Sequence, residues 1–255
     1  MNAISKEAVL KGATLALAAT GSLALTWGAT PAIAQGKAGF APMGDPFNSF
    51  SIGIGGGVDI FRTHADSYAC DYNCVGYGGP LSATGGFGSV EIGKDFRFGS
   101  LVLGIAGEYN FGSKSDSVSG SNCYYSSCTD STTTLKLGNS YAAIARLGML
   151  VAPQTLVYGL FGYTWQQYTA AVTLDDEYYS HHWSWSHSGT TGGLTFGIGG
   201  EWLINQMMSV KAEYRLVRLD PPASVGDCCA GAVAHFDKVD DHVFRGILSI
   251  KLPGL

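Results

Sequence analysis

The chain has 255 residues, of which 14% are charged, and its formal net charge is −5. An acidic chain without a basic patch is not typical of nucleic-acid-binding proteins, so we expect no nucleic-acid partner. Glycine is abundant, yet no run after Trp27 reaches the roughly 18 apolar residues of a membrane-spanning helix. Two classes remain, a transmembrane β-barrel and an exported water-soluble β-domain.

Residues 1–34 have the features of a secretory signal peptide. Lys6 and Lys11 give a basic start, an apolar stretch from Ala13 to Trp27 follows, and Ala32-Ile33-Ala34 is a small-residue cleavage site. The alternative is a membrane-anchoring helix, which the Ala-rich, glycine-interrupted run disfavours. The sequence therefore predicts export.

Residues 35–48 contain Gly and Pro without periodicity and are expected to form a flexible N-terminal segment. Residues 49–255 are expected to form one all-β domain, because they hold eight stretches in which apolar and polar residues alternate. Each stretch is long enough to cross a bilayer as a tilted strand of roughly 9–11 residues. The stretches are 49–61, 84–97, 100–112, 135–151, 155–172, 189–204, 207–219 and 242–252.

The connections between these stretches alternate in length. The joins at 97–100, 152–154 and 204–206 are tight turns, whereas the others are long and polar. The long connections are 62–83, 113–134, 173–188 and 220–241. Short turns at one end and long loops at the other are typical of outer-membrane barrels. The sequence therefore predicts an eight-stranded antiparallel transmembrane up-and-down β-barrel with short periplasmic turns and four long extracellular loops, located in the cell outer membrane.

The alternation also assigns two faces to each strand. In the third stretch Leu101, Leu103 and Ile105 share one face, and Gly104 and Glu108 share the other. A soluble barrel has the same alternation with the faces exchanged, so the long-loop asymmetry and the aromatic residues toward strand ends decide in favour of the membrane. Those aromatic residues are Tyr109, Phe111, Tyr141, Trp202 and Tyr214.

Charged residues on the polar faces are expected to meet in the lumen. An eight-stranded barrel has an interior that side chains fill, and charges enclosed there must pair. The first interpretation is a structural ionic plug, and the alternative is a narrow gated pore for ions or small solutes whose ion pairs exchange partners. The predicted members are Asp59, Glu91, Glu108, Glu201 and Glu213, which face Arg146, Lys211, Arg215, Arg245 and Lys251.

All six cysteines fall in the predicted long loops. Their even number in an exported chain indicates disulfides, and fifteen pairings are possible. The simplest proposal pairs Cys70 with Cys74 and Cys123 with Cys128, with Cys228 and Cys229 reaching another loop.

The third long connection carries His181, His182 and His187 among aromatic residues. Imidazoles beside aromatic rings suit haem or a transition metal, but the spacing matches no standard zinc signature, and we expect no metal or cofactor. A hydrolytic site built from Asp175, Asp176 and His187 is a further alternative. Long loops are poor scaffolds for catalysis, so the chain is predicted not to be an enzyme.

Several segments resemble small barrels related to OmpA, in particular opacity-type porin-like proteins and alphaproteobacterial surface antigens. Gly199-Gly200-Glu201-Trp202-Leu203 leads into Ser209-Val210-Lys211-Ala212-Glu213-Tyr214-Arg215, which is similar to a Lys-x-Glu-Tyr-Arg strand of that family. Ala143-Ile144-Ala145-Arg146-Leu147-Gly148 is similar to its Arg-x-Arg-x-Gly strand, and the strand from His242 to Ile247 is similar to its last one. The family usually ends on an aromatic residue, whereas this chain ends Leu252-Pro253-Gly254-Leu255.

These observations together predict a structural and surface-interaction role in the envelope. The expected partners are outer-membrane lipid, lipopolysaccharide and the barrel-assembly machinery. Extracellular surfaces, haem or metal bound through the loops form the alternative.

Overall fold

The computed structural model describes residues 44–70, 74–124, 127–176, 181–227 and 232–253. The chain divides into Met1–Phe40, which lies outside the described residues, and a second unit, Ala41–Leu255. The predicted signal peptide and most of the predicted N-terminal segment therefore lie outside the described residues. The described part of the second unit consists of strands joined by turns and short connections.

Eleven strands occur in the described residues. Their alternating side chains suit a wall with one apolar and one polar face. They are β1 (Ser49–Cys70), β2 (Cys74–Phe98), β3 (Leu101–Gly112), β4 (Lys114–Tyr124), β5 (Ser127–Ala152), β6 (Thr155–Asp176), β7 (His181–Leu203), β8 (Met208–Leu219), β9 (Val225–Asp227), β10 (Ala232–Phe236) and β11 (Val239–Pro253).

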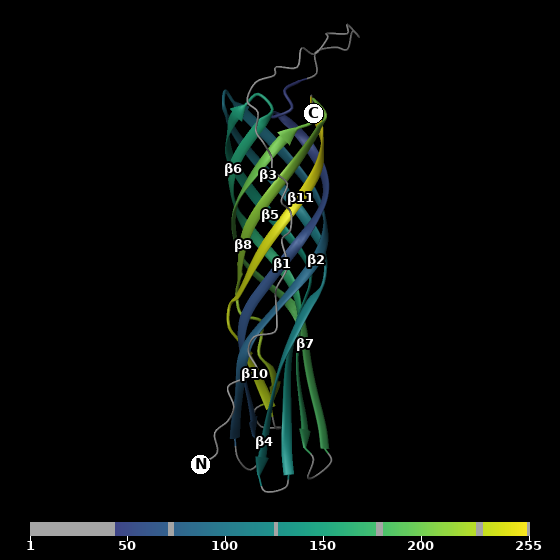
Figure 1. The fold of residues 1–255 in the computed structure, drawn as a ribbon, viewed down its shortest axis with the longest axis vertical. Coiled ribbons are helices and arrows are strands. Elements are labelled where there is room, and N and C mark those ends of the chain that lie inside the picture. The colour runs from purple at the N-terminus through teal and green to yellow at the C-terminus, as the bar shows by residue number, and fades with distance from the viewer. Residues whose placement is uncertain (1–43, 71–73, 125–126, 177–180, 228–231, 254–255) are drawn as a thin grey trace, which may run out of the picture. The chain divides into compact units, whose positions relative to one another are not determined.

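Eight of the strands close into a ring (Figure 1). The order is β1, β2, β3, β5, β6, β7, β8 and β11, and each pairs antiparallel with its neighbour. The register of β1 against β11 runs from Ser49 opposite Pro253 to Arg62 opposite Asp240, and it completes the ring. The predicted all-β, antiparallel barrel architecture is thereby confirmed.

Tight turns join the strands at one end of the ring. Gly99, between β2 and β3, has a φ of 65°, in the left-handed region that glycine adopts without strain. The Arg97 side chain donates a hydrogen bond to its carbonyl oxygen at 2.7 Å. In outer-membrane barrels this end faces the periplasm.

At the other end the predicted long loops are largely strand. The alternation of β1 and β2 continues to a hairpin whose last described pair is Cys70 opposite Cys74, and β5 and β6 pair as far as Thr129 opposite Asp176. Figure 1 shows these extensions at the lower end of the view, around β4, β7 and β10. The ring strands thus continue well beyond the eight predicted crossing segments.

In these extensions the ring divides into two sheets. One sheet is formed by β9, β10 and the outer parts of β1 and β2, and the other by β4 and the outer parts of β5, β6 and β7. Among the described residues no strand pairing joins β2 to β4 or β9 to β7. We call this two-sheet region the outer sandwich and the level where the ring divides, near Gly112 and Lys114, the fork.

Apolar side chains fill the space between the two sheets. Ala65, Leu81 and Ala234 from one sheet and Leu135 and Val172 from the other are completely buried. Apolar burial of this kind stabilises a fold by roughly 25 cal/mol for each Å² removed from water. The polar composition of the predicted loops hid this core, because serine and threonine occupy most of the outward positions of β4 and of the outer part of β7.

The ring presents its apolar residues outward. Ile54, Ile105 and Ile198 are each more than half exposed, whereas the inward positions of the same strands carry small or charged residues. Aromatic side chains mark the fork end of this band, where Tyr141 stacks on Trp165 with 5.3 Å between ring centroids. An outward apolar band with aromatic residues near its edge is the pattern of a lipid-facing barrel.

Candidate functional site: the charged lumen

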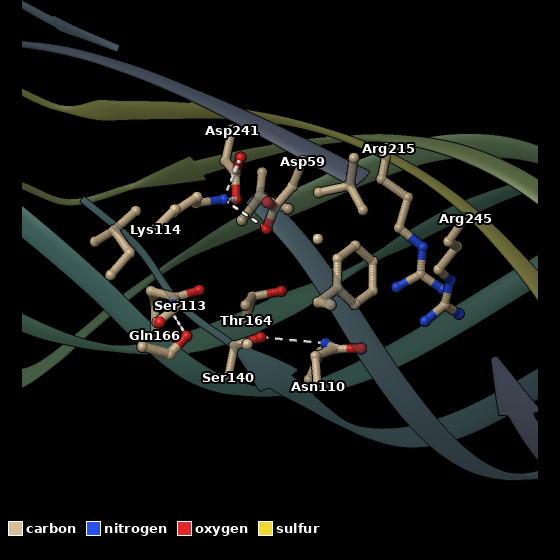
Figure 2. A pocket seen from close by; sticks show the side chains of 18 residues that line it. Asp59, Asn110, Ser113, Lys114, Ser140, Thr164, Gln166, Arg215, Asp241 and Arg245 are labelled. Carbon is tan, nitrogen blue, oxygen red and sulfur yellow. Dashed lines mark hydrogen bonds and ion pairs between the residues drawn. The ribbon is translucent and has the colours of Figure 1, made fainter. Parts of the chain in front are cut away.

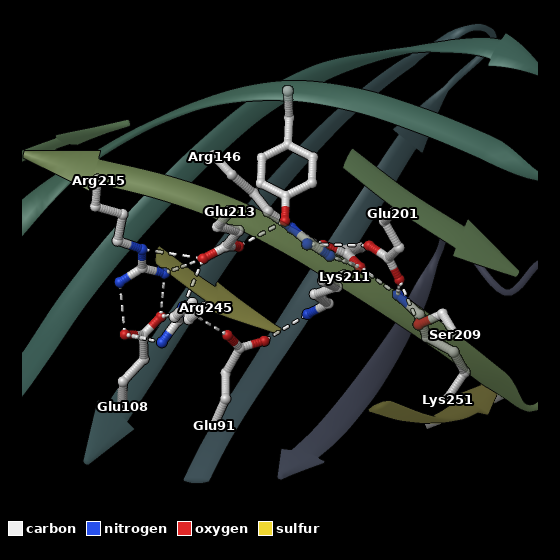
Figure 3. Close-up of polar contacts among 12 residues, drawn as sticks. Glu91, Glu108, Arg146, Glu201, Ser209, Lys211, Glu213, Arg215, Arg245 and Lys251 are labelled. Atoms are coloured by element: carbon white, nitrogen blue, oxygen red, sulfur yellow. Dashed lines mark hydrogen bonds and ion pairs between the residues drawn. The ribbon is translucent and has the colours of Figure 1, made fainter. Parts of the chain in front are cut away.

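The interior of the ring is lined by ionised side chains from seven of its eight strands, and the eighth, β6, contributes Tyr158 (Figure 3). Because strand residues alternate in direction, a charged residue between two lipid-facing residues projects into the lumen. The structure places all ten predicted lumen residues on this inward side and divides them among three groups. We name these the turn-side cluster, the central cluster and the fork triad.

The turn-side cluster lies nearest the tight turns. Arg146 donates two hydrogen bonds to Asp95, at 2.9 and 2.5 Å, and its third nitrogen is 3.0 Å from a carboxylate oxygen of Glu201. The Lys251 ammonium bridges the same two carboxylates at 3.0 and 2.6 Å. The four charges therefore balance, and Ser209 donates a further hydrogen bond to Glu201 at 2.7 Å.

Phe47 closes the lumen below the turn-side cluster. Its side chain is 1% exposed and packs with Val102, Leu156 and Leu203. The Lys251 ammonium lies 5.7 Å from the centre of its ring, a cation–π distance. The turn-side end of the lumen is therefore filled by an aromatic side chain.

The central cluster contains three carboxylates and three basic side chains. The Arg215 guanidinium donates to both oxygens of Glu108 at 2.7 and 2.6 Å, and Arg245 donates to the same two oxygens at 2.9 and 2.6 Å. Both guanidiniums also bond one oxygen of Glu213. The remaining members are Glu91, which accepts from Arg245 at 3.0 Å, and Lys211, which pairs with Glu91.

Charge balance explains how these groups tolerate burial. Together the turn-side and central clusters hold five carboxylates and five basic groups, all buried. A buried charge left without a partner costs several kcal/mol, whereas bidentate arginine–carboxylate pairs supply both charge and geometry. With all members ionised the two clusters are therefore neutral as a whole, and their hydrogen bonds connect side chains of different strands across the lumen.

The fork triad stands apart from these clusters. Asp59, which the sequence grouped with the other lumen residues, bonds Lys114 at 2.6 Å, and Lys114 also bonds both oxygens of Asp241 at 2.8 Å. A cavity of about 40 Å³ separates the triad from the central cluster (Figure 2). Its polar lining includes Asn110, Ser140, Thr164 and Gln166.

Sequence reasoning missed Asp95, Lys114 and Asp241. Asp95 has the same parity as Glu91 on β2, so alternation alone was enough to find it. Lys114 and Asp241 fall in segments predicted as loops, so the alternation assigned them to neither the inner nor the outer face of a strand. The structure places them on strands at the fork.

The histidines of the predicted binding loop lie on β7 instead of a loop. His182 pairs with Asp175 on the neighbouring strand, and the His187 ring lies 6.2 Å from that of Tyr168. Positions 182 and 187 differ by an odd number in a strand, so these two imidazoles project from opposite faces. Asp175 pairs with His182 and not with His187, its partner in the predicted hydrolytic set. The side chains of Asp176 and His181 lie outside the described residues.

The predicted disulfide partners are placed by strand register. Cys70 lies directly opposite Cys74 at the end of the β1–β2 hairpin, and Cys123 lies directly opposite Cys128 in the β4–β5 hairpin. Cys228 and Cys229 lie outside the described residues.

A family model described as an outer membrane protein beta-barrel domain matches residues 16–248. The chain belongs to this family. It is an outer-membrane barrel protein, which agrees with the ring of strands and its apolar outer band. It is also 29% identical, over 182 residues, to the 31 kDa outer-membrane immunogenic proteins of Brucella melitensis and Brucella suis, and the match covers 68% of this chain and 74% of each relative.

The solved structures that match this chain are distant from it in sequence. The outer membrane protease OmpT from Escherichia coli matches with a TM-score of 0.46 and 9% identity, over 81% of this chain and 97% of that chain. Neisserial surface protein A matches with a TM-score of 0.32 and 13% identity, over 78% of this chain and 99% of that chain. The attachment invasion locus protein of Yersinia pestis matches with a TM-score of 0.29 and 11% identity, over 75% and 97%.

The described residues contain no helix with the length and apolar character of a membrane span. No group of three or more His, Cys, Asp or Glu side chains among them is arranged to hold a metal ion.

Proposed function

We propose that this outer-membrane protein has a structural and surface-display role, and that it is not an enzyme. The observation that carries the proposal is the filled interior. From the turns outward, the lumen holds Phe47, two neutral ionic clusters, a small cavity, the fork triad and the apolar core of the outer sandwich. A barrel filled in this way acts as a rigid pedestal in the membrane.

The outer sandwich presents hydrophilic contacts to the cell exterior. Exposed hydroxyls of Ser119 and Thr132 bond across the β4–β5 hairpin at 2.8 Å, and at the ends of β8 and β11, beside the outer sandwich, Arg218 and Asp240 form an exposed ion pair at 2.8 Å. A surface-exposed region is also what the name of the Brucella relatives, immunogenic proteins, implies for those proteins. Lipid and lipopolysaccharide are the partners we assign to the apolar band.

A strain that lacks this protein tests the role. We expect it to be more sensitive to detergent, and we expect full resistance to return with the wild-type chain. A double variant of exposed outer-sandwich residues, Tyr68→Ser with His182→Ser, is expected to restore detergent resistance but to reduce adhesion of the cells to surfaces. An unchanged phenotype in both assays on deletion contradicts the proposal.

Conductance measurements test the closed lumen separately. The folded barrel in a planar bilayer is expected to give no unitary current steps, because ion pairs and apolar side chains fill the lumen on both sides of the small cavity. Regular steps that scale with the number of inserted barrels contradict the pedestal role and favour the gated-pore alternative.

The strand register of the cysteines predicts disulfide bonds in two hairpins of the outer sandwich. Cross-strand neighbours lie about 4.5–5.5 Å apart, which is within the range that a disulfide spans. We expect Cys70–Cys74 and Cys123–Cys128 disulfides in protein isolated from the outer membrane. Proteolysis and mass spectrometry under alkylating conditions, without and with reductant, check this; alkylated Cys70 or Cys123 without reductant rules the pairing out.

A further inference from the structure

The fork cavity has a local excess of negative charge. Two carboxylates, Asp59 and Asp241, share the single ammonium of Lys114, so with both carboxyls ionised the triad carries a net charge of −1. The other charged side chains that line the cavity are Arg215 and Arg245, and both are already bonded to carboxylates of the central cluster. The central and turn-side clusters therefore do not compensate the charge of the triad.

The cavity also contains an unpaired acceptor. The Asn110 amide nitrogen donates to the Ser140 hydroxyl at 3.1 Å, while its Oδ1 atom is buried without a hydrogen-bond partner. A buried acceptor without a donor is unfavourable, because it has lost its hydrogen bonds with water and gained none in the protein. Figure 2 shows Asn110, Thr164 and Asp59 around the same space. Apolar side chains such as Leu137 and Val217 line part of the cavity, and its polar part offers oxygen atoms beside the two carboxylates. Oxygen atoms together with excess negative charge are complementary to a hard cation and not to an anion.

Size and access agree with a small ion. The cavity of about 40 Å³ exceeds the roughly 10–15 Å³ that one water-sized particle needs, so it has room for an ion with one or two waters. The Asp59 side chain is 18% exposed, so solvent reaches the triad. Ser113, at the unpaired junction of β3 and β4, lines the cavity and is itself exposed.

We propose that the fork cavity binds one monovalent cation, Na⁺ or K⁺, held by oxygen atoms that include the carboxylates of Asp59 and Asp241 and the Asn110 carbonyl. A single positive charge brings the triad to neutrality, whereas a divalent ion leaves an excess of +1. Water satisfies the Asn110 oxygen but not the charge. The site requires no histidine or cysteine, and it does not depend on the surface role of the barrel.

Unfolding of the folded barrel in zwitterionic detergent tests the site. At one ionic strength, NaCl or KCl is expected to raise the melting midpoint above that in N-methyl-D-glucamine chloride, whose cation is too large for the cavity. An ion at about nine times its dissociation constant lowers the unfolded fraction about tenfold. Asp241→Asn removes the excess charge, so it is expected to abolish the difference between salts.

Asp240→Asn is the matched control. Asp240 directly precedes Asp241 on β11, is exposed and pairs with Arg218. The Asp240→Asn variant is therefore expected to keep the difference between salts. Equal midpoints in the three salts for the wild-type barrel overturn the proposal, as does a difference that survives Asp241→Asn. Wild-type crystals grown in RbCl give a second measurement, independent of variant folding. Anomalous rubidium density in the cavity supports the site, and its absence from the cavity argues against it.

Discussion

Replacing Arg245 by methionine is expected to destabilise the barrel by about 3–5 kcal/mol, the cost of breaking a buried ionic group by removing one partner. Arg245 is the cation that all three central carboxylates share, with bonds of 3.0 Å to Glu91, 2.6 Å to Glu108 and 2.7 Å to Glu213. Methionine matches its apolar stem but leaves the cluster with a net charge of −1. The lumen then encloses three carboxylates, Glu91, Glu108 and Glu213, with only two basic side chains between them, so the carboxylates repel one another.

The measurement is urea unfolding of the refolded barrel in lipid, followed by the difference in electrophoretic mobility between boiled and unboiled samples. Arg218→Met is the control, because Arg218 makes a comparable pair with Asp240 on the exposed surface, where ion pairs contribute about 0–1 kcal/mol. We expect the control to unfold near the wild-type midpoint. A loss below about 1 kcal/mol for Arg245→Met would mean that water solvates the central cluster and that the lumen is wetter than its burial indicates.

The alternation in sequence predicted the ring because the apolar face of a lipid-facing strand is a nearly unbroken period-two pattern. In β3 that pattern runs from Leu101 to Phe111, and every outward residue along it is exposed. The same rule did not detect the outer sandwich. There the inward residues, such as Val118 on β4, alternate with serine and threonine, which are as frequent in loops as in strands.

The sequence predicts which residues face the lumen, but it does not predict which of them form ion pairs with one another. The alternation along each strand places Arg146 and Arg215 inward. It does not show which carboxylate each of them pairs with, because strands in a barrel are tilted and staggered. Arg146, on β5, bonds Asp95 on β2 and Glu201 on β7, and neither strand is its neighbour in the ring. Pairing across the lumen is set by the stagger of all eight strands, which no single segment encodes.

Inward glycines complete this arrangement by leaving room for the long basic side chains. A Cβ atom built on Gly104 would lie 2.6 Å from the Arg146 side chain and 2.5 Å from Asp95. One built on Gly197 would lie 3.0 Å from Arg215. The glycine content of the chain is therefore partly a packing requirement of the lumen's ionic clusters, since an eight-stranded ring has little space for both a side-chain lining and cross-lumen arginines.

The closing edge of the ring provides the most sensitive test of this close packing. A Cβ atom on Gly57 of β1 would lie 2.0 Å from the backbone oxygen of Phe244 on β11 and 2.9 Å from the Cα atom of Arg245. Neither atom is the end of a flexible side chain, so the two backbones must separate. Gly57→Ala is therefore expected to cost about 3 kcal/mol or more, at the upper end of overpacking effects, and to leave most of the protein without the mobility shift.

Gly246→Ala separates this explanation from a general intolerance of alanine at the β1–β11 edge. Gly246 lies on β11 opposite Gly56, one position from the pair formed by Gly57 and Arg245, and a Cβ there meets its nearest neighbour at an ordinary 3.9 Å. Both changes add one methyl group and reduce backbone freedom equally in the unfolded chain. We expect Gly246→Ala to fold and shift like the wild type, and equal behaviour of the two variants would show that β1 and β11 approach less closely than these distances indicate.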